Sequence, residues 1–291
     1  MTYQACPTKR APGQKRRTKA QMEALQETIY ETLRHNHPMT VRQLFYQLVG
    51  QDAIDKTEAE YDNAVSRLLA DMRRAGMVPW EWVVDQTRWM RKPRTYSSLQ
   101  RMLNNAAVGY RRALWDNQDA YVEIWLEKDA LAGILYDVTD EFDVPLMVSK
   151  GFSSITYLHD AAMTIQVQEK PAYLYYFGDH DPSGLSITET IENTIREFAP
   201  DVDLHFEKVG VLPWQIESWH LPTRPTKKTD TRSKGFEGDS VEVDAIPPQT
   251  LRDLARGSIV HHIDHEAWAR VQQVEQEERE TLQRFTEMLG A

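Results

Sequence analysis

Apolar residues recur at the spacing of an α-helix in three stretches near the start of the chain. The expected helices are 22–33, 41–49 and 61–72. Thr40 and Thr57 stand where N-capping side chains belong, before the second and third helices, and Gly76 stands where the third helix should end. A short stretch typical of a β-strand follows at 77–84. The first third of the chain is therefore predicted to be mostly helical.

From residue 121 onward, short apolar runs alternate with amphipathic helical stretches. The expected strands are 121–126, 144–148, 172–177 and 202–211. The helices between them are expected at 130–138, 154–165 and 183–198. This alternation predicts an α/β fold in which helices cover both faces of a parallel sheet. A linking helix at 97–120 should precede the sheet, and a long amphipathic helix at 264–290 should follow it.

Three short helices followed by a basic β-ribbon are the parts of a winged helix-turn-helix, a domain that binds DNA. We place this domain at residues 20–96. The side chains expected to contact DNA are Arg67, Arg73 and Arg74 from the third helix, and Arg88 and Arg91 from the ribbon. An ordinary helical bundle with a solvated charged face is the alternative interpretation of the same pattern.

Charge is unevenly distributed along the 291 residues, a length that suits two domains or one large one. The net charge is −10, yet residues 1–120 hold 19 Lys and Arg against 13 Asp and Glu. Residues 1–19 contain basic side chains and no acid, and we expect a flexible arm that seeks phosphate. A basic half joined to an acidic half suggests a polyanion-binding module beside one rich in carboxylates. Alternatively, the acidity only keeps the second half in solution.

Cysteine content and hydropathy exclude several classes of protein. Cys6 is the only cysteine, so an internal disulfide framework and a Cys-rich zinc site are excluded. No apolar run reaches about 18 residues, and no apolar segment follows the basic N-terminus, so we expect neither a membrane span nor a secretory signal. A cytoplasmic, reducing location is the expectation.

Acidic residues follow two of the predicted strands directly. Glu127 comes after the strand at 121–126, and Asp179 and Asp181 come after the strand at 172–177. If these strands are near neighbours, the three carboxylates meet at one edge of the sheet, where sites of α/β folds gather. Carboxylates that repel one another need a cation, and an all-oxygen set favours Mg²⁺ or Mn²⁺. The alternative is that all three are ordinary turn and helix-start residues.

Two segments make the sequence similar to a known family. Ile124-Trp125-Leu126-Glu127-Lys128-Asp129-Ala130-Leu131 resembles the first Toprim motif, and Gly178-Asp179-His180-Asp181-Pro182-Ser183-Gly184 resembles the Toprim Asp-x-Asp motif of the A subunit of type IIB DNA topoisomerases. Ser149-Lys150-Gly151-Phe152-Ser153-Ser154 is similar to a Gly-Lys-Gly-aromatic segment of that family. The resemblance implies a Toprim domain at 121–291, with a C-terminal extension, behind a winged helix. It also implies that Glu127, Asp179 and Asp181 bind Mg²⁺ and that Lys150 contacts DNA.

The same family carries a catalytic tyrosine four residues after an arginine in its winged helix. This chain has Arg42-Gln43-Leu44-Phe45-Tyr46, so Tyr46 aligns with the nucleophile. Gln43 and Phe45 depart from the family pattern, which has an acid and a second tyrosine there. Arg42 and Tyr46 lie four residues apart, so they would share one exposed helical face, on which the arginine could grip phosphate while the phenol attacks. The alternative is a tyrosine at the edge of a packed interface.

The resemblance implies Mg²⁺-dependent cleavage of double-stranded DNA by tyrosine transesterification, as in topoisomerases and the related enzymes that make meiotic double-strand breaks. It further implies a homodimer, in which the tyrosine of one protomer faces the acids of the other, and a separate ATPase subunit for strand passage. Two alternatives remain: a Toprim nuclease that uses metal-activated water, and a DNA-binding protein without chemistry. The expected setting is the cytoplasm, in association with the nucleoid.

Overall fold

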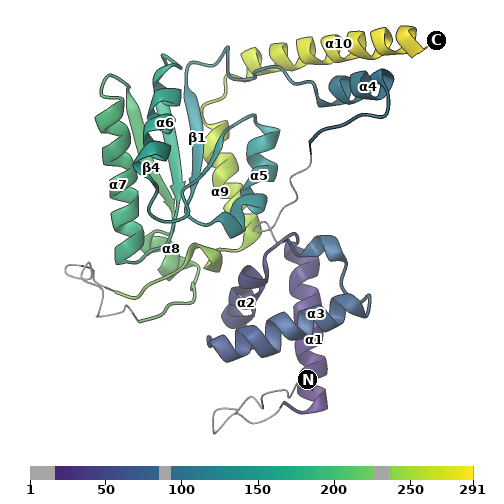
Figure 1. Ribbon diagram of the computed structural model, residues 1–291. Coiled ribbons are helices and arrows are strands. Elements are labelled where there is room, and N and C mark those ends of the chain that lie inside the picture. The colour runs from purple at the N-terminus through teal and green to yellow at the C-terminus, as the bar shows by residue number, and fades with distance from the viewer. Residues whose placement is uncertain (1–16, 85–92, 226–235, 237, 291) are drawn as a thin grey trace, which may run out of the picture.

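A four-stranded parallel sheet forms the centre of the second part of the chain (Figure 1). The computed structural model describes residues 17–84, 93–225, 236 and 238–290. The strands are β1 (Tyr121–Leu126), β2 (Leu146–Val148), β3 (Ala172–Phe177) and β4 (Leu204–Gly210). Their order is β2-β1-β3-β4, so β1 and β3 are direct neighbours and Leu126 pairs with Phe177 at their carboxyl ends. The predicted α/β fold is confirmed, with β2 and β4 two residues shorter at their starts than expected.

Helices cover both faces of this sheet, which explains why its central strands are almost wholly buried. The covering helices are α5 (Ala132–Glu141) and α9 (Pro248–Val260) on one face, and α6 (Ile155–Gln166) and α7 (Pro182–Phe198) on the other. Successive side chains of a strand point to opposite faces. Thus Ile124 and Leu126 pack with α5 and α9, whereas Trp125 packs with α6 and α7.

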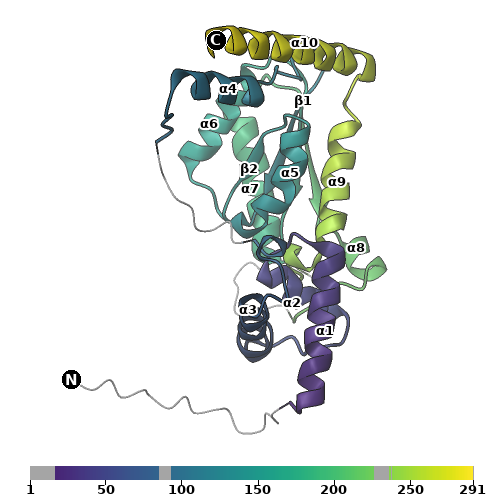
Figure 2. The same ribbon diagram turned by 90° about the vertical axis from the view of Figure 1, so that its right-hand side faces the viewer.

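Three helical segments precede the sheet, where the apolar spacing predicted them. They are α1 (Lys19–Asn36), α2 (Val41–Gly50) and the π-helix η1 (Glu60–Ser66), which continues directly into α3 (Arg67–Arg74). Thr40 caps α2 by accepting a hydrogen bond from the Gln43 N–H, while the Gln43 side chain accepts one from the Thr40 N–H. Gln43, which departs from the family pattern, therefore completes a capping box. Figure 2 shows these helices at the end of the sheet opposite α10 (His265–Gly290).

The predicted strand at 77–84 is wrong. The segment contains the 3₁₀ helix η2 (Trp80–Trp82), and its only extended pairing among the described residues is a bridge between Val83 and Met39. The Trp82 ring stacks on His37 and the Arg73 guanidinium stacks on Trp80, so the aromatic residues pack onto the helices instead of alternating along a ribbon. The remainder of the expected ribbon, with Arg88 and Arg91, lies outside the described residues.

The predicted linking helix at 97–120 is also shorter than expected. It is α4 (Leu99–Gly109), which lies beside α10 across the end of the sheet (Figures 1 and 2). Beyond Gly109, backbone groups bond to α10: the Arg112 N–H donates to Glu275, and the Tyr110 carbonyl accepts from Arg279. These tertiary bonds replace the helical ones, and the sequence pattern does not reveal them. Among the described residues no helix combines the length and apolar character needed to cross a membrane.

A buried carboxyl group lies within the sheet itself. Glu123 on β1 is about 1% exposed and accepts hydrogen bonds from the Tyr121 hydroxyl at 2.8 Å and the Trp125 indole N–H at 2.7 Å. Burial raises the pKa of Glu123 from its ordinary value near 4.5 to about 7, although both hydrogen bonds oppose this shift. The folded chain therefore holds this proton at a pH where the unfolded chain has lost it.

Because the pKa of Glu123 is raised on folding, its contribution to stability is fully present below pH 4.5 and is lost as the pH rises to about 7. The free energy of unfolding should fall over this interval by on the order of 2–3 kcal/mol from this group alone. The Glu123→Gln variant should lack that part of the pH dependence. Urea unfolding of both proteins at pH 5, 6, 7 and 8 measures it, and parallel profiles would contradict the assignment.

Candidate functional site

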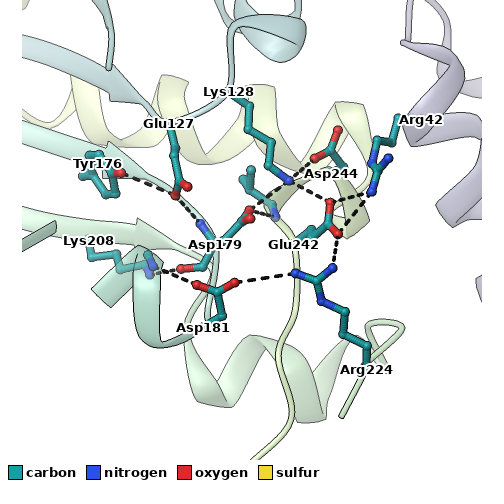
Figure 3. A network of polar contacts seen from close by, with 12 residues as sticks. Arg42, Glu127, Lys128, Tyr176, Asp179, Asp181, Lys208, Arg224, Glu242 and Asp244 are labelled. Atoms are coloured by element: carbon teal, nitrogen blue, oxygen red, sulfur yellow. Dashed lines mark hydrogen bonds and ion pairs between the residues drawn. The ribbon is translucent and has the colours of Figure 1, made fainter. Parts of the chain in front are cut away.

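The acids that follow β1 and β3 lie side by side at the carboxyl edge of the sheet (Figure 3). Pairing of these strands brings Glu127 to Asp179, whose backbone N–H donates to Glu127 Oε2 at 2.9 Å. Asp181 caps α7 by accepting a hydrogen bond from the Gly184 N–H at 2.8 Å. The structure thus places all three predicted acids in one region, and Asp181 also has the helix-start role that was the alternative.

Two glycines permit this close approach of chain segments. A Cβ atom on Gly178 would lie 2.7 Å from Glu127 Oε2 and would also clash with the ring of Tyr176. A Cβ atom on Gly184 would clash with the carbonyl oxygen of Asp179. The glycines of the Asp-x-Asp segment are therefore required by contact between the turn, the helix start and the acids.

A second acidic segment, absent from our predictions, completes the cluster. Glu242 precedes η5 (Val243–Ala245) and Asp244 lies within it, in a segment joined to the Asp-x-Asp turn by hydrogen bonds between Val241 and His180. The Val243 N–H donates to Asp179 Oδ1 at 2.8 Å, which fixes this segment against the predicted acids. Both new acids are nearly or fully buried.

Lys128 lies at the centre of the cluster and contacts acids from both segments. Its Nζ is 3.1 Å from Asp179 Oδ1, 2.9 Å from Glu242 Oε2 and 2.5 Å from Asp244 Oδ2. Burial disfavours the charge of Lys128, but the three carboxylates outweigh it and raise the pKa of the ammonium. A lysine next to the predicted Glu127 therefore offsets part of the negative charge of the site.

Glu242 is the most heavily paired acid described. Besides Lys128, it contacts the Arg42 guanidinium at 3.1 Å and that of Arg224 at 3.0 Å. Burial opposes its charge, yet Lys128, Arg42 and Arg224 lower the pKa of Glu242 to about 2. Arg42 belongs to α2, and its partner is 200 residues away in the sequence, so this carboxylate joins the helical region to the edge of the sheet.

The donors that the three predicted acids offer are of one chemical kind. They supply only carboxylate oxygens, and burial, together with the charge of Glu127, raises the pKa of Asp179 while Lys128 opposes this. Asp244 Oδ1, also buried, has no hydrogen-bond partner in the described part of the chain. Oxygen-only sets of this kind suit Mg²⁺ or Mn²⁺. In the part of the chain that the structure describes, no three acidic, histidine or cysteine side chains are placed so that together they could hold a metal ion. In this arrangement Lys128 lies among the acids.

Tyr46 is not on an exposed helical face, and this prediction is wrong. The side chain is about 2% exposed and belongs to the same apolar cluster as Val241 and Val243 of the second acidic segment. Burial and the charge of Glu242 raise the pKa of Tyr46, while Arg42 and Lys128 oppose the shift. The ring also lies 5.1 Å from Lys56 Nζ. The phenol is therefore protonated and enclosed by basic groups at the boundary between the two parts of the fold.

The predicted DNA-contacting residues are divided among several environments. Arg67 is exposed on α3, and Arg74 is largely exposed with a weak contact to Asp71. Arg73 is partly buried, and its guanidinium is engaged by the chain itself, because it donates to the Trp80 carbonyl at 2.8 Å. Lys150 is exposed and lies 3.0 Å from Asp129. It lines an open pocket of about 430 Å³ together with Arg42, Lys128 and the acids Glu127, Asp129, Glu242 and Asp244, whereas Asp179 and Asp181 are not among the lining residues.

Sequence signals for the missed residues exist but are weak. Lys128 directly follows a predicted metal ligand, and Glu242 and Asp244 repeat the two-residue spacing of Asp179 and Asp181. Neither feature distinguishes a site from a solvated surface, since acids at this spacing are common in loops. Lys208 and Arg224 carry no local signal, although Lys208 donates to the Asp179 carbonyl at 2.6 Å and burial lowers its pKa to about 8.

Replacement of Gly184 by alanine should displace Asp179 and destabilise the fold. The added methyl group meets backbone, which cannot rotate away, so we expect a loss of about 1–3 kcal/mol in the free energy of unfolding. Gly257→Ala in α9 is the matched control, because nothing lies within 4 Å of its added methyl and alanine favours a helix. Chemical denaturation measures both variants, and equal stabilities would contradict the close approach at Gly184.

Comparison of the chain with known protein families finds no match, and comparison with curated proteins finds none either. The similarity to type IIB topoisomerases therefore rests on the motifs quoted above and on the chemistry of the residues that carry them.

Proposed function

We propose that this protein cleaves DNA by tyrosine transesterification, in the manner of the A subunit of type IIB topoisomerases. In this proposal the helical part of the chain is a winged-helix domain and the sheet is a Toprim domain. The Tyr46 hydroxyl oxygen would form a bond to a backbone phosphorus while the bond from phosphorus to the 3′ oxygen breaks. The phenolic proton is lost and the departing 3′ oxygen gains one, which leaves the protein joined to a 5′ phosphate.

One observation carries the proposal. A continuous path of ion pairs runs from Arg42 through Glu242 and Lys128 to Asp179, and so connects the tyrosine-bearing helix α2 to the acids of the sheet. A nucleophile, phosphate-binding cations and carboxylates thus come together within one chain. Such a combination suits phosphoryl transfer, where charge on the transferring group must be stabilised. An ordinary packed tyrosine does not need this concentration of buried charge.

Glu127, Asp179 and Asp181 would hold Mg²⁺ or Mn²⁺, an ion that supplies stabilisation to charge developing on phosphate oxygens. The chain's own residues would do the rest. Arg42 orients the phosphate for the Tyr46 hydroxyl, and Lys128 offsets the repulsion among the carboxylates. The apolar cluster that packs around Tyr46 excludes water that would compete with the phenol.

Double-stranded DNA is the proposed substrate, with Arg67, Arg74 and Lys150 as exposed contacts to its backbone. We propose a homodimer, because each protomer has one tyrosine in the aligned position and two staggered cuts make a double-strand break. Strand passage would require a separate ATPase subunit, since the sequence contains no Gly-x-x-x-x-Gly-Lys-Ser/Thr loop.

Hydrolysis by a metal-activated water is the second candidate function. It is favoured by the burial of Tyr46, whose protonated hydroxyl must become accessible before it can attack. In that case Tyr46 would only pack between the two parts of the fold, and the acids would serve the same metal. The two functions differ in whether the protein becomes attached to the DNA.

Removal of the Tyr46 hydroxyl separates these functions. In Tyr46→Phe, protein-linked DNA ends should be abolished, a decrease on the order of 10³-fold or more, because the attacking atom is gone. Labelled DNA incubated with protein and Mn²⁺ and resolved on a denaturing gel, before and after protease treatment, measures this. Tyr61→Phe is the matched control, since Tyr61 also lies 5.8 Å from the Arg42 guanidinium carbon, and it should retain cleavage.

Cleavage that survives unchanged in Tyr46→Phe, with no protein on the ends, would replace transesterification by hydrolysis. The Asp179→Asn variant serves as the common negative control, because both functions lose activity when this acid is removed. Activity that persists in Asp179→Asn would exclude the acidic cluster as the site of chemistry.

A further inference from the structure

Three cations converge on a single buried carboxylate at the boundary between the helical region and the sheet. Glu242 is about 5% exposed, and the side chains of Arg42, Lys128 and Arg224 contact it at 2.9–3.2 Å (Figure 3). Glu242 is the nearest recorded acid of Arg42 and Arg224, whereas Lys128 lies nearer to Asp244. The position of the Glu242 carboxylate is therefore a place where the protein concentrates positive charge on one oxyanion.

The three cations come from separate parts of the chain. Arg42 is on α2, Lys128 follows β1, and Arg224 is paired with Ser240 through backbone hydrogen bonds. Buried ion pairs are costly to desolvate, and a single pair is enough to neutralise one carboxylate. Lys128 also pairs with Asp179 and Asp244, and Arg224 lies 3.6 Å from Asp181, so these cations serve several acids. Their convergence on Glu242 from three elements matches the way proteins bind phosphate, with arginine and lysine directed at the same small group of oxygens.

We propose that Arg42, Lys128 and Arg224 form a binding site for a phosphodiester group of a nucleic-acid strand, and that the Glu242 carboxylate occupies this site when no strand is bound. This inference deepens the proposed function, on which it rests, by naming the side chains that take the phosphate. A carboxylate and a phosphate present similar pairs of oxygens to a guanidinium, so one replaces the other without rebuilding the site.

The location of the site agrees with this occupant. Arg42, Lys128 and Glu242 line the open pocket of about 430 Å³ together with Lys150 and the acids Glu127, Asp129 and Asp244, so this pocket connects the carboxylate with solvent; Arg224 contacts Glu242 from outside the pocket lining. Tyr46 lies beside Glu242, whose charge raises the pKa of the phenol, while Arg42 and Lys128 act on it in the opposite direction. A phosphate that displaces Glu242 is therefore brought next to the phenol, and the departing carboxylate uncovers it.

The opposite pKa shifts of the two groups argue against a role for Glu242 as the base that deprotonates Tyr46. The three cations lower the pKa of Glu242 to about 2, whereas burial raises the pKa of Tyr46 above its ordinary value of 10. Proton transfer from Tyr46 to Glu242 is therefore unfavourable in this arrangement. Glu242 thus serves as the occupant of the site and not as a proton acceptor.

The test is DNA binding in the absence of chemistry. All variants carry Tyr46→Phe, EDTA is present, and the anisotropy of a fluorescent 30-base-pair duplex reports affinity at several salt concentrations. Glu242→Gln should bind the duplex about tenfold more tightly, because the internal competitor no longer carries charge. Glu141→Gln is the matched control: Glu141 forms a two-oxygen pair with Arg256, at 2.7 and 2.8 Å, between α5 and α9. It should change affinity less than twofold.

A second pair of variants keeps the test decisive if Glu242→Gln does not fold. Arg224→Gln should bind more weakly, and the slope of log affinity against log salt should fall by about 0.9, as expected for one lost phosphate contact. Arg256→Gln is its control and should leave the slope unchanged. Arg224 is accessible enough to be replaced without opening the core, since its side chain is about 39% exposed.

Equal affinities for Glu242→Gln and Glu141→Gln, or an unchanged slope for Arg224→Gln, would overturn the phosphodiester site. These binding results are independent of the cleavage experiment. If Tyr46→Phe still cleaves DNA, transesterification fails while tighter binding by Glu242→Gln still supports the site. If protein-linked ends form but affinity is unaffected by Glu242 and Arg224, the proposed function stands and this inference fails.

Discussion

Charge balance among buried groups at the carboxyl edge of the sheet is the interaction on which this structure depends. Glu127, Asp179, Glu242 and Asp244 lie within one small region, where their mutual repulsion and their loss of water both disfavour folding. Lys128 makes this arrangement stable, because one ammonium contacts three of the carboxylates. The location of that lysine is set by β1, so the sheet and the site are stabilised together.

The geometry around this balance is set by backbone contacts. Pairing of β1 with β3 brings Glu127 against the Asp179 N–H, and the two glycines of the following turn allow α7 to begin directly beside it. The segment that carries Glu242 is then fixed by the hydrogen bond from Val243 to Asp179. Glu127 and Asp179 are therefore each oriented by a main-chain donor, and the proposed chemistry on phosphate would require such preorganisation.

The helical region is attached to this edge by the same network. Arg42 pairs with Glu242, and Tyr46 packs into an apolar cluster that is continuous from α1 to the helices α5 and α9. In this arrangement the tyrosine is protected from solvent and its acidity is reduced. In the proposed function, a nucleophile that is unreactive without substrate would be an advantage, and the carboxylate beside Tyr46 would provide a physical basis for that restraint.

The sequence by itself determined the local elements and the placement of three acids. Apolar residues that recur every 3.6 residues predict helices, and short apolar runs predict strands, because burial of one face is a local property. The helices α1–α3 and the strands β1–β4 lie where these patterns predicted them. Glu127 and Asp179 were found because parallel strands end at a common edge. Only the tertiary structure decided that Tyr46 is buried, that 77–84 is not a strand, and that Glu242, Asp244 and Arg224 belong to the site. Glu242 contacts Arg42 although the two residues are 200 positions apart in the sequence. A local periodicity does not indicate which distant segment will cover a given face.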